Sequence, residues 1–174
     1  HLRSVLDRLK GRFNVEVSTA PPSTPYKESL RKNAEVRGRH KKQTGGHGQF
    51  GDCVIQVKPL PRGEGFQFVD KITGGAIPRQ WIPAVEAGVK DAMAKGAIGF
   101  PVVDVSVTLI DGSFHAVDSS EHSFQQAGRL GMVEAMQQCG SILLEPIEKL
   151  SIYTPSSSTP KINSAVSSHN GQIL

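Results

Sequence analysis

The chain has 174 residues, of which 37% are hydrophobic and 21% are charged, and its formal net charge is +4. This allows one ordinary soluble domain with additions at its ends. No apolar run approaches the roughly 18 residues that span a bilayer, and no signal segment opens the chain, so we expect a cytoplasmic protein without a membrane partner. Cys53 and Cys139 are far apart, which excludes a disulfide framework and fits a reducing compartment.

The first half of the chain predicts a helix followed by extended segments. Residues 2–13 form one apolar face at helical spacing, which comprises Leu2, Val5, Leu6, Leu9 and Phe13. NVEVST alternates like a strand until APPSTP breaks it, and YKESLRKNAEVRGRHKKQ reads as one or two extended polar segments. DCVIQVKPL is a strand with Cys53, Ile55 and Val57 on one face. An apolar helix face at the very start needs a partner, so we expect a fragment of a longer protein.

The second half alternates strands with helices. PRGEG turns into FQFVDKI, and PAVEAGVKDAMAKG is a helix that Gly96 ends. Its buried face should comprise Val85, Gly88, Val89, Ala92 and Met93. PVVDVSVTLIDG, with β-branched residues and strict alternation, is the clearest strand. The order of strands, helix, strand, helix and strand predicts an α+β fold with two helices on one face of a sheet.

The second of these helices has a start signal and a stripe of small residues. We predict Asp118 as its N-cap, with Glu121 three residues later in a capping box. Close contact with a sheet is expected along Phe124, Ala127, Gly128, Gly131, Met132, Ala135, Met136 and Cys139. Gly140 should end this helix, and SILLEPIEKLSIY should return as a long strand. A Ser/Pro loop, a helix and a turn follow.

Basic residues gather between Lys27 and Gln49. Seven Lys or Arg face two Glu there, so the local charge is +7 − 2 = +5, more than the surplus of the whole chain. They are Lys27, Arg31, Lys32, Arg37, Arg39, Lys41 and Lys42. A strip of this kind suits a polyanion, and the alternative is a solvated strand face.

TGGHGQFGD, residues 44–52, is a glycine-rich segment inside the basic strip. A phosphate-binding P-loop needs Gly, four residues and then Gly-Lys-Ser/Thr between a strand and a helix. This segment has no lysine and leads into a strand, so it is not a nucleotide cradle of that kind. A hairpin tip with His47 and Gln49 at its crest remains, either with a binding role or as a plain turn.

Two catalytic readings are weak. A metal site would draw on His40, His47, His115, His122, Asp111, Asp118 and Glu121, but no pair has the i, i+4 spacing of a zinc hydrolase. A triad of Ser113, His115 and Asp118 would crowd three residues into one turn, where they rarely align. We therefore expect neither a metal nor catalytic residues.

His115 lies in DGSFHAVD, between the clearest strand and the helix that follows it. Loops on a rigid scaffold often carry recognition residues. An imidazole there can stack on a base or hydrogen-bond to a phosphate, as in the recognition of single-stranded RNA. The alternative is a surface histidine without a role.

Taken in order, these segments resemble bacterial elongation factor G over essentially the whole chain. The resemblance is carried by HLRSVLDRLKGRFNVEV, GRHKKQTGGHGQFGDCVIQVKPL, GFPVVDVSVTLIDGSFHAVDSSEHSF and LLEPIEKLSIYTP. It implies the end of domain III at 1–26, domain IV at 27–149 and the start of domain V at 150–174. It further implies a two-layer α+β domain like the second domain of a ribosomal protein, with a left-handed βαβ crossover and partial ferredoxin-like domains on either side. No cofactor is expected here, since GTP and Mg²⁺ belong to a domain of the parent protein that is absent.

The resemblance also implies a role at the ribosome, as a monomer. In this family domain IV reaches the decoding region of the small subunit, where the partners are rRNA and the tRNA and mRNA of the A site. Two tip loops contact the mRNA–tRNA duplex, at Gly45–Gly51 and at Gly112–Asp118. The residues carried over to these loops are Gly45, Gly46, His47, Gly48, Gln49, Ser113, His115 and Asp118. Phosphate contacts are expected from Arg37, Arg39, Lys41 and Lys42.

Two positions depart from the family pattern. His47 stands where an arginine is common, and Asp52 stands where a more basic or neutral residue is common. Both changes should weaken the attraction of the tip to RNA. A paralogue that acts in ribosome recycling or ribosome protection is therefore an alternative to the main translocase. A general RNA-binding module and a stand-alone metal hydrolase are the other two alternatives.

Overall fold

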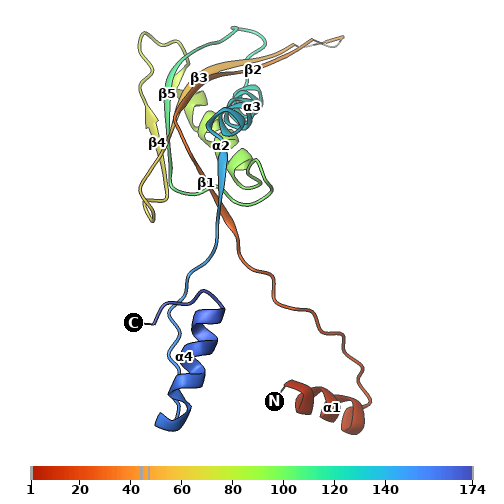
Figure 1. The fold of residues 1–174 in the computed structure, drawn as a ribbon. Coiled ribbons are helices and arrows are strands. Elements are labelled where there is room, and N and C mark those ends of the chain that lie inside the picture. Colours follow the sequence, from red (N-terminus) through yellow and green to blue (C-terminus); the bar gives the residue numbers. More distant parts are fainter. Residues whose placement is uncertain (1, 44, 47, 174) are drawn as a thin grey trace.

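A mixed sheet of four strands carries the fold, in the order β2-β3-β5-β4. The strands are β2 (Ala34–Lys42), β3 (Gln49–Pro59), β4 (Phe66–Asp70) and β5 (Val105–Ser113). The first two pair antiparallel, β3 and β5 also pair antiparallel, and β4 lies parallel to β5. This computed structural model describes residues 2–43, 45–46 and 48–173 (Figure 1). It confirms the α+β class.

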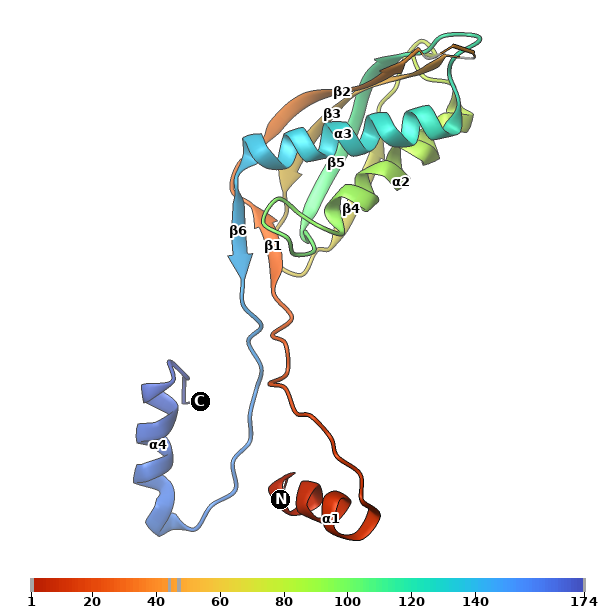
Figure 2. The same ribbon diagram turned by 90° about the vertical axis from the view of Figure 1, so that its right-hand side faces the viewer.

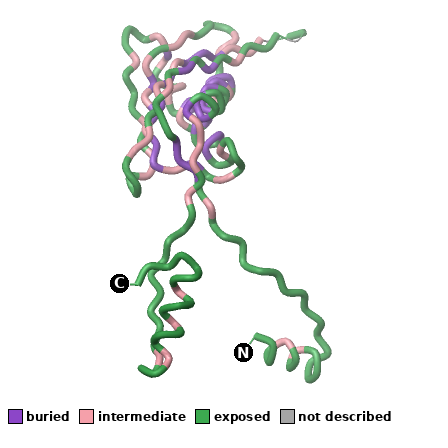
Figure 3. The backbone as a smooth tube through the Cα atoms, in the orientation of Figure 1, coloured by how far each residue is buried: buried purple, intermediate pink, exposed green. Residues whose placement is uncertain are grey.

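Two helices cover one face of this sheet, as the stripes of the sequence predict. They are α2 (Ile82–Met93) and α3 (Glu121–Cys139), which Figure 2 shows side by side in front of the strands. Cys53, Ile55 and Val57 of β3 are fully buried between sheet and helices. The expected faces of α2 and α3 are likewise buried throughout. The buried residues therefore gather between the four-stranded sheet and its two helices (Figure 3).

Glycines allow the two helices to touch through their backbones. A Cβ on Gly88 of α2 would overlap the carbonyl oxygen of Gln125 in α3. A Cβ on Gly128 of α3 would overlap the carbonyl oxygen of Val85 in α2. Since the obstacle is backbone in both cases, no side-chain movement can relieve it. These glycines fix the distance between the helices.

A second, two-stranded sheet joins the ends of the domain. Strands β1 (Lys27–Leu30) and β6 (Ser141–Leu144) pair antiparallel, and between them the chain makes the whole domain. The carboxylate of Glu28 in β1 is fully buried. It accepts hydrogen bonds of 2.9 Å from the backbone N–H groups of Ala97, Ile98 and Phe100. This carboxylate therefore anchors the connection between α2 and β5.

The expected strands beyond this two-stranded sheet do not form. NVEVST belongs to an unpaired extended segment, and β6 ends at Leu144 rather than continuing through SILLEPIEKLSIY. A strand needs a partner, and β1 offers only four residues. Pro146 also has no N–H to donate. Ile147 and Tyr153 are accordingly 97% and 96% exposed.

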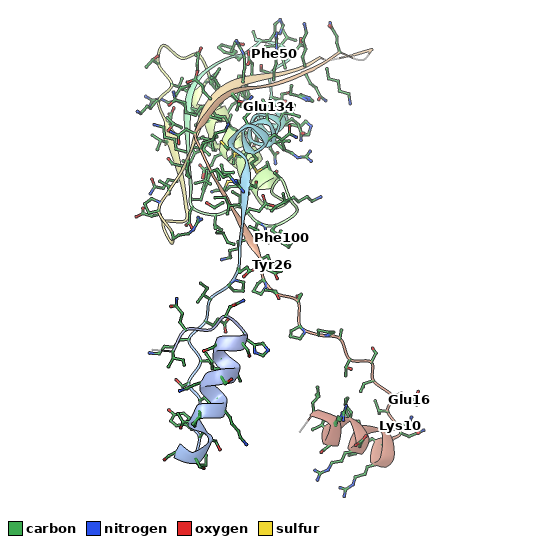
Figure 4. All side chains as sticks on the ribbon, viewed as in Figure 1. Lys10, Glu16, Tyr26, Phe50, Phe100 and Glu134 are labelled. Carbon is green, nitrogen blue, oxygen red and sulfur yellow. The ribbon has the colours of Figure 1, made fainter. Side chains whose placement is uncertain are left out.

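Helices α1 (Leu2–Phe13) and α4 (Thr159–Ser168) lie apart from the sheet and its two helices (Figure 1). Every residue of both is at least partly exposed. The short helices η1 (Arg79–Trp81) and η2 (Ser156–Ser158) precede α2 and α4. Tyr26 packs edge-on against Phe100 where the N-terminal extension enters the domain, with ring centroids 5.5 Å apart (Figure 4).

The predicted cap of α3 is wrong by two residues. Helix α3 has Ser120 as its N-cap, and the Ser120 hydroxyl accepts a hydrogen bond from the backbone N–H of Ser123 at 3.2 Å. Asp118 precedes the helix, and its backbone carbonyl accepts from the N–H of Phe50 at 2.8 Å. A tertiary contact thus holds Asp118 outside the helix and leaves the capping position to Ser120.

Candidate nucleic-acid interface

Two segments far apart in the sequence are joined at one end of the domain. One is the end of the β2–β3 hairpin, and the other is the loop between β5 and α3. Phe50 and Ser119 form a parallel bridge between them, and the Ser119 hydroxyl donates to the Phe50 carbonyl at 2.8 Å. The same hydroxyl accepts from the backbone N–H of His115 at 2.9 Å. Phe50 marks this end of the molecule, called the tip below (Figure 4).

A cleft of about 270 Å³ opens between the two segments. Its walls are Lys41, Lys42, Gln43, Gln49, Phe50, His115 and Asp118. Five of these were named as site residues from the sequence, whereas Gln43 and Phe50 were not, although Phe50 lies within the predicted first loop. Both missed residues neighbour predicted ones in the chain, but only the meeting of the two segments shows that they line a common surface.

The loops at the tip begin and end at other residues than expected. Gln49 pairs with Lys42 as the first residue of β3, so only residues 43–48 connect the two strands. Likewise Gly112 and Ser113 belong to β5 rather than to the second loop. Strand pairing extends this far because Gly112 pairs with Cys53 and Ser113 pairs with Asp52 on the neighbouring strand.

The glycines of the first loop divide into two kinds. Gly45 and Gly46 are exposed, and Gly45 has a φ of 45° with open space around it. Gly48 lies against the second segment, where an added Cβ would come within 2.7 Å of the Asp118 carboxylate. A larger residue at 48 would therefore have to displace the Asp118 side chain. His47 lies outside the described residues.

Gln49 is held by a residue that the sequence analysis did not assign to the site. The Nε2 atom of His40 lies 2.8 Å from Oε1 of Gln49. The ring of His40 in turn meets the ring of His122, in the first turn of α3, edge-on at 6.4 Å. His40 thus connects the hairpin end to the helix beneath it.

His115 is more than half exposed, with its ring oriented by its own loop. Its Nδ1 atom accepts hydrogen bonds from the backbone N–H groups of Val117 at 3.3 Å and Asp118 at 3.2 Å. The Asp118 carboxylate lies 3.4 Å from the same nitrogen, and its side chain is 29% exposed. The Nε2 side of the ring is left for contacts outside the loop.

The four predicted phosphate-contacting residues differ in their surroundings. Lys41 and Lys42 are exposed and line the cleft. Arg39 lies over the ring of Phe50, 5.5 Å from its centroid, which is a cation–π geometry. Arg37 donates two hydrogen bonds to Asp52, at 2.8 and 2.6 Å, so its guanidinium already holds an anion.

The Asp52 carboxylate is buried beneath the side chains of Arg37 and Ser113. Its side chain is 1% exposed, and it accepts a further hydrogen bond of 2.8 Å from the Ser113 hydroxyl. Burial by itself would raise the pKa of Asp52, but the hydrogen bonds from Arg37 and Ser113 and the charges of Arg37 and Arg39 outweigh it and lower that pKa. The hydrogen bonds and charge of Asp52 raise the pKa of Arg37 in turn. Asp52 therefore acts on the tip through Arg37 rather than by facing the cleft.

Among the residues that the structure describes, neither the metal site nor the catalytic triad considered above has its residues in a suitable arrangement. No group of three or more His, Cys, Asp or Glu residues there could hold a metal ion. The Ser113 hydroxyl donates to Asp52, and Nδ1 of His115 accepts from backbone, so the triad considered from the sequence is not assembled. Within the same described residues, no helix has the length and apolarity to cross a membrane.

Comparison with known proteins gives one consistent result. The family model described as elongation factor G, domain IV, matches residues 22–140. An elongation factor G-like protein of Synechocystis sp. is 52% identical over 174 residues, and one of Mycobacterium tuberculosis is 49% identical over 175. Elongation factor G of Aquifex pyrophilus is 45% identical over 175 residues. Each comparison covers 100% of this chain, which spans about a quarter of the length of these relatives.

A solved structure from Thermus thermophilus agrees with the fold. It is 36% identical and superposes with a TM-score of 0.86 over 100% of this chain, which corresponds to 26% of that structure's chain. The sequence comparisons and the fold comparison agree. The chain belongs to the elongation factor G family, with residues 22–140 matching its domain IV.

Proposed function

We propose that this chain is the part of a translational GTPase that places domain IV in the decoding site of the small ribosomal subunit during elongation, where it promotes the movement of tRNA and mRNA. The observation that carries the proposal is the cleft at the tip. It joins Lys41, Lys42 and Gln49 from one segment to His115 from another in one place. The family to which the chain belongs supports the assignment.

The mechanism needs no covalent chemistry from these residues. Lysines at the tip attract and position phosphate groups, while Gln49 and His115 contact the RNA they approach. The sheet and its two helices support the tip, since strands and helices hold recognition side chains more rigidly than free loops. GTP and Mg²⁺ bind in a part of the parent protein outside this chain and set the timing. The partners are small-subunit rRNA and the tRNA and mRNA of the A site, and the protein acts as a cytoplasmic monomer.

Complementation tests this function directly. The parent protein is expressed in cells depleted of their main elongation factor G, and its translocation rate is measured on purified ribosomes. Rescue of growth with fast, GTP-dependent translocation is the expected result. Absence of both translocation and ribosome-stimulated GTP hydrolysis would refute the assignment. Comparable binding to unrelated single-stranded RNA, without ribosome dependence, would favour a general RNA-binding module.

A paralogue with a specialised role is the second candidate. The relatives at 52% and 49% identity are named elongation factor G-like proteins, whereas the elongation factor G of A. pyrophilus is 45% identical. The pairing of Arg37 with the buried Asp52 engages one of the predicted phosphate-contacting cations, which agrees with an altered tip. Ribosome-stimulated GTP hydrolysis without translocation or rescue would support this candidate. Assays of ribosome recycling and of ribosome protection would then separate its two forms.

A further inference from the structure

The orientation of the Gln49 amide is set by His40. A carbonyl oxygen accepts hydrogen bonds and cannot donate them, so the 2.8 Å contact requires that Nε2 of His40 carries the proton. With Oε1 of Gln49 turned toward His40, the amide nitrogen and its two N–H groups are what Gln49 offers to the cleft that it lines. Gln49 is therefore a donor at this surface, although its side chain could in principle accept as well.

The same reasoning fixes the ring of His115. Two backbone N–H groups donate to its Nδ1 atom, which must then hold a lone pair. The Asp118 carboxylate lies 3.4 Å from Nδ1, but a nitrogen that accepts from two N–H groups has no proton to donate to it. The neutral ring consequently carries its proton on Nε2, and that N–H is the group available outside the loop. His115 is a donor too.

We propose that His40 is a positioning residue that makes Gln49 a hydrogen-bond donor, so that Gln49 and His115 together select acceptor atoms of an RNA duplex. The ammonium groups of Lys41 and Lys42 in the same cleft are donors as well. This inference rests on the proposed function for the identity of the ligand, while the role of His40 rests on the contact with Gln49 alone.

An acceptor-selective tip explains how one site serves many codons. In the minor groove of a duplex, each base pair presents purine N3 and pyrimidine O2 as hydrogen-bond acceptors, and a pair that contains adenine shows the same acceptors whichever strand holds the adenine. RNA adds the 2′-oxygens and the phosphates as further acceptors. Two N–H donors therefore find acceptors in this groove whatever the base sequence. The one group that differs is the amino group of guanine, which is itself a donor. Asp118 also lines the cleft, and its carboxylate, which can only accept hydrogen bonds, lies against Gly48.

Nitrogen NMR of the 174-residue chain, labelled with ¹⁵N in histidine and glutamine, tests the positioning role without any ribosome. The expected result is that His40 and His115 are both protonated on Nε2 when neutral, and that His40→Phe shifts the side-chain N–H signals of Gln49. His40→Gln, which keeps an N–H donor, should restore them. A His40 ring protonated only on Nδ1, or Gln49 signals indifferent to His40→Phe, would overturn the proposal. An unchanged urea midpoint of His40→Phe shows that the fold is intact.

Translocation by the parent protein tests the consequence. His40→Phe should slow translocation by roughly three- to tenfold, the value of one hydrogen bond, and His40→Gln should recover most of the rate. Gln49→Ala should slow it similarly, and the double variant should be no slower than Gln49→Ala because both act through one amide. Gln49→Glu, which offers only acceptors, should be slower still. His169→Phe, just beyond the remote helix α4, should match the unmodified protein.

The outcomes separate the two proposals. Additive losses from His40→Phe and Gln49→Ala would show that His40 acts independently of Gln49 and would overturn the positioning role. A parent protein that fails to translocate in every form would refute the proposed function and the RNA ligand, while the NMR result would still decide whether His40 orients Gln49.

Discussion

Arg37 of β2 and Asp52 of β3 form a two-bond ion pair, with guanidinium Nε and Nη2 at 2.8 and 2.6 Å from the two carboxylate oxygens. Ser113 of β5 donates to the same carboxylate, so one buried acid connects three strands below the tip. Asp52 is 1% exposed while the Arg37 side chain is 59% exposed. The pair is therefore a buried anion covered by a surface cation, and Asp52 contributes more to stability than an exposed acid would.

Asp52→Asn should destabilise the domain in a pH-dependent way. The pKa of Asp52 is lowered in the folded state, so the stability from its charge is present above the unfolded pKa of about 3.9 and is lost as pH falls through the folded pKa. At pH 7 we expect a loss of roughly 1–2 kcal/mol, because neutral hydrogen bonds replace charge-assisted ones. Urea unfolding at pH 7 and in steps below about pH 4.5 measures it.

The difference between the two proteins isolates Asp52 from the other acids that titrate in this range. It should shrink toward zero below the folded pKa, where Asp52 is also uncharged. Asp7→Asn, at an exposed site in α1, is the matched control and should leave the urea midpoint unchanged. A difference that stays constant from neutral pH down to about pH 2.5 would contradict this account.

Glu28→Gln should cost about 2 kcal/mol of unfolding free energy. The two carboxylate oxygens of Glu28 accept three backbone N–H groups, whereas a glutamine has one acceptor oxygen and would turn an NH₂ group toward a donor. Glu35→Gln, in the exposed part of β2, makes the same chemical change and should cost less than about 0.5 kcal/mol. Equal midpoints for the two variants in urea would argue against the anchoring role.

Gly128→Ala should destabilise the domain by about 3 kcal/mol, since the added methyl meets the backbone of α2 and forces the helices apart. Gly11→Ala, with nothing within 4 Å of the added Cβ, is the control and should not destabilise the protein. Thermal and urea unfolding followed by circular dichroism measure both. A stable Gly128→Ala protein would mean that the two helices can separate at little cost.

Both cysteines should resist thiol reagents in the folded protein. Burial, with a smaller contribution from the charge of Asp52, raises the pKa of Cys53 to about 12. Burial also raises the pKa of Cys139, partly offset by Lys32. Because the thiolate is the reactive form, we expect almost no labelling at about pH 8 in native buffer and two labelled thiols in denaturant. Rapid labelling of either cysteine in native buffer would contradict the packing of β3 or α3.

His115→Ala should slow translocation by about tenfold and change stability by less than about 0.5 kcal/mol. The side chain is 58% exposed, so it contributes little to the core, and only its Nδ1 atom is engaged within its own loop. Stopped-flow translocation by the parent protein and urea unfolding of the same variant measure the two effects. An unchanged translocation rate would remove His115 from the site, and His169→Ala serves as the control for a histidine elsewhere.

Much of the candidate site was predictable because its residues stand next to strand ends and glycines. The hairpin, the loop that holds His115 and the basic strip all follow from local pattern and from resemblance. What could not be predicted is how each side chain is engaged. Arg37 and Lys41 look alike in sequence, yet one is paired with Asp52 and the other lines the cleft. His40 gave no signal for its contact with Gln49.

The α+β class, the buried faces of β3, α2 and α3, and the family were all predictable from the amino-acid order, because periodicity and motif are properties of neighbouring residues. The burial of Glu28 and Asp52, and the capping of α3 by Ser120 rather than Asp118, became visible only in the folded chain. Each of these depends on groups distant in the chain, such as the N–H of Phe100 on Glu28 at a separation of 72 residues. A charged side chain is buried only where hydrogen-bond or ion-pair partners compensate the loss of its hydration. Such partners come from distant parts of the chain, so a local sequence pattern cannot predict them.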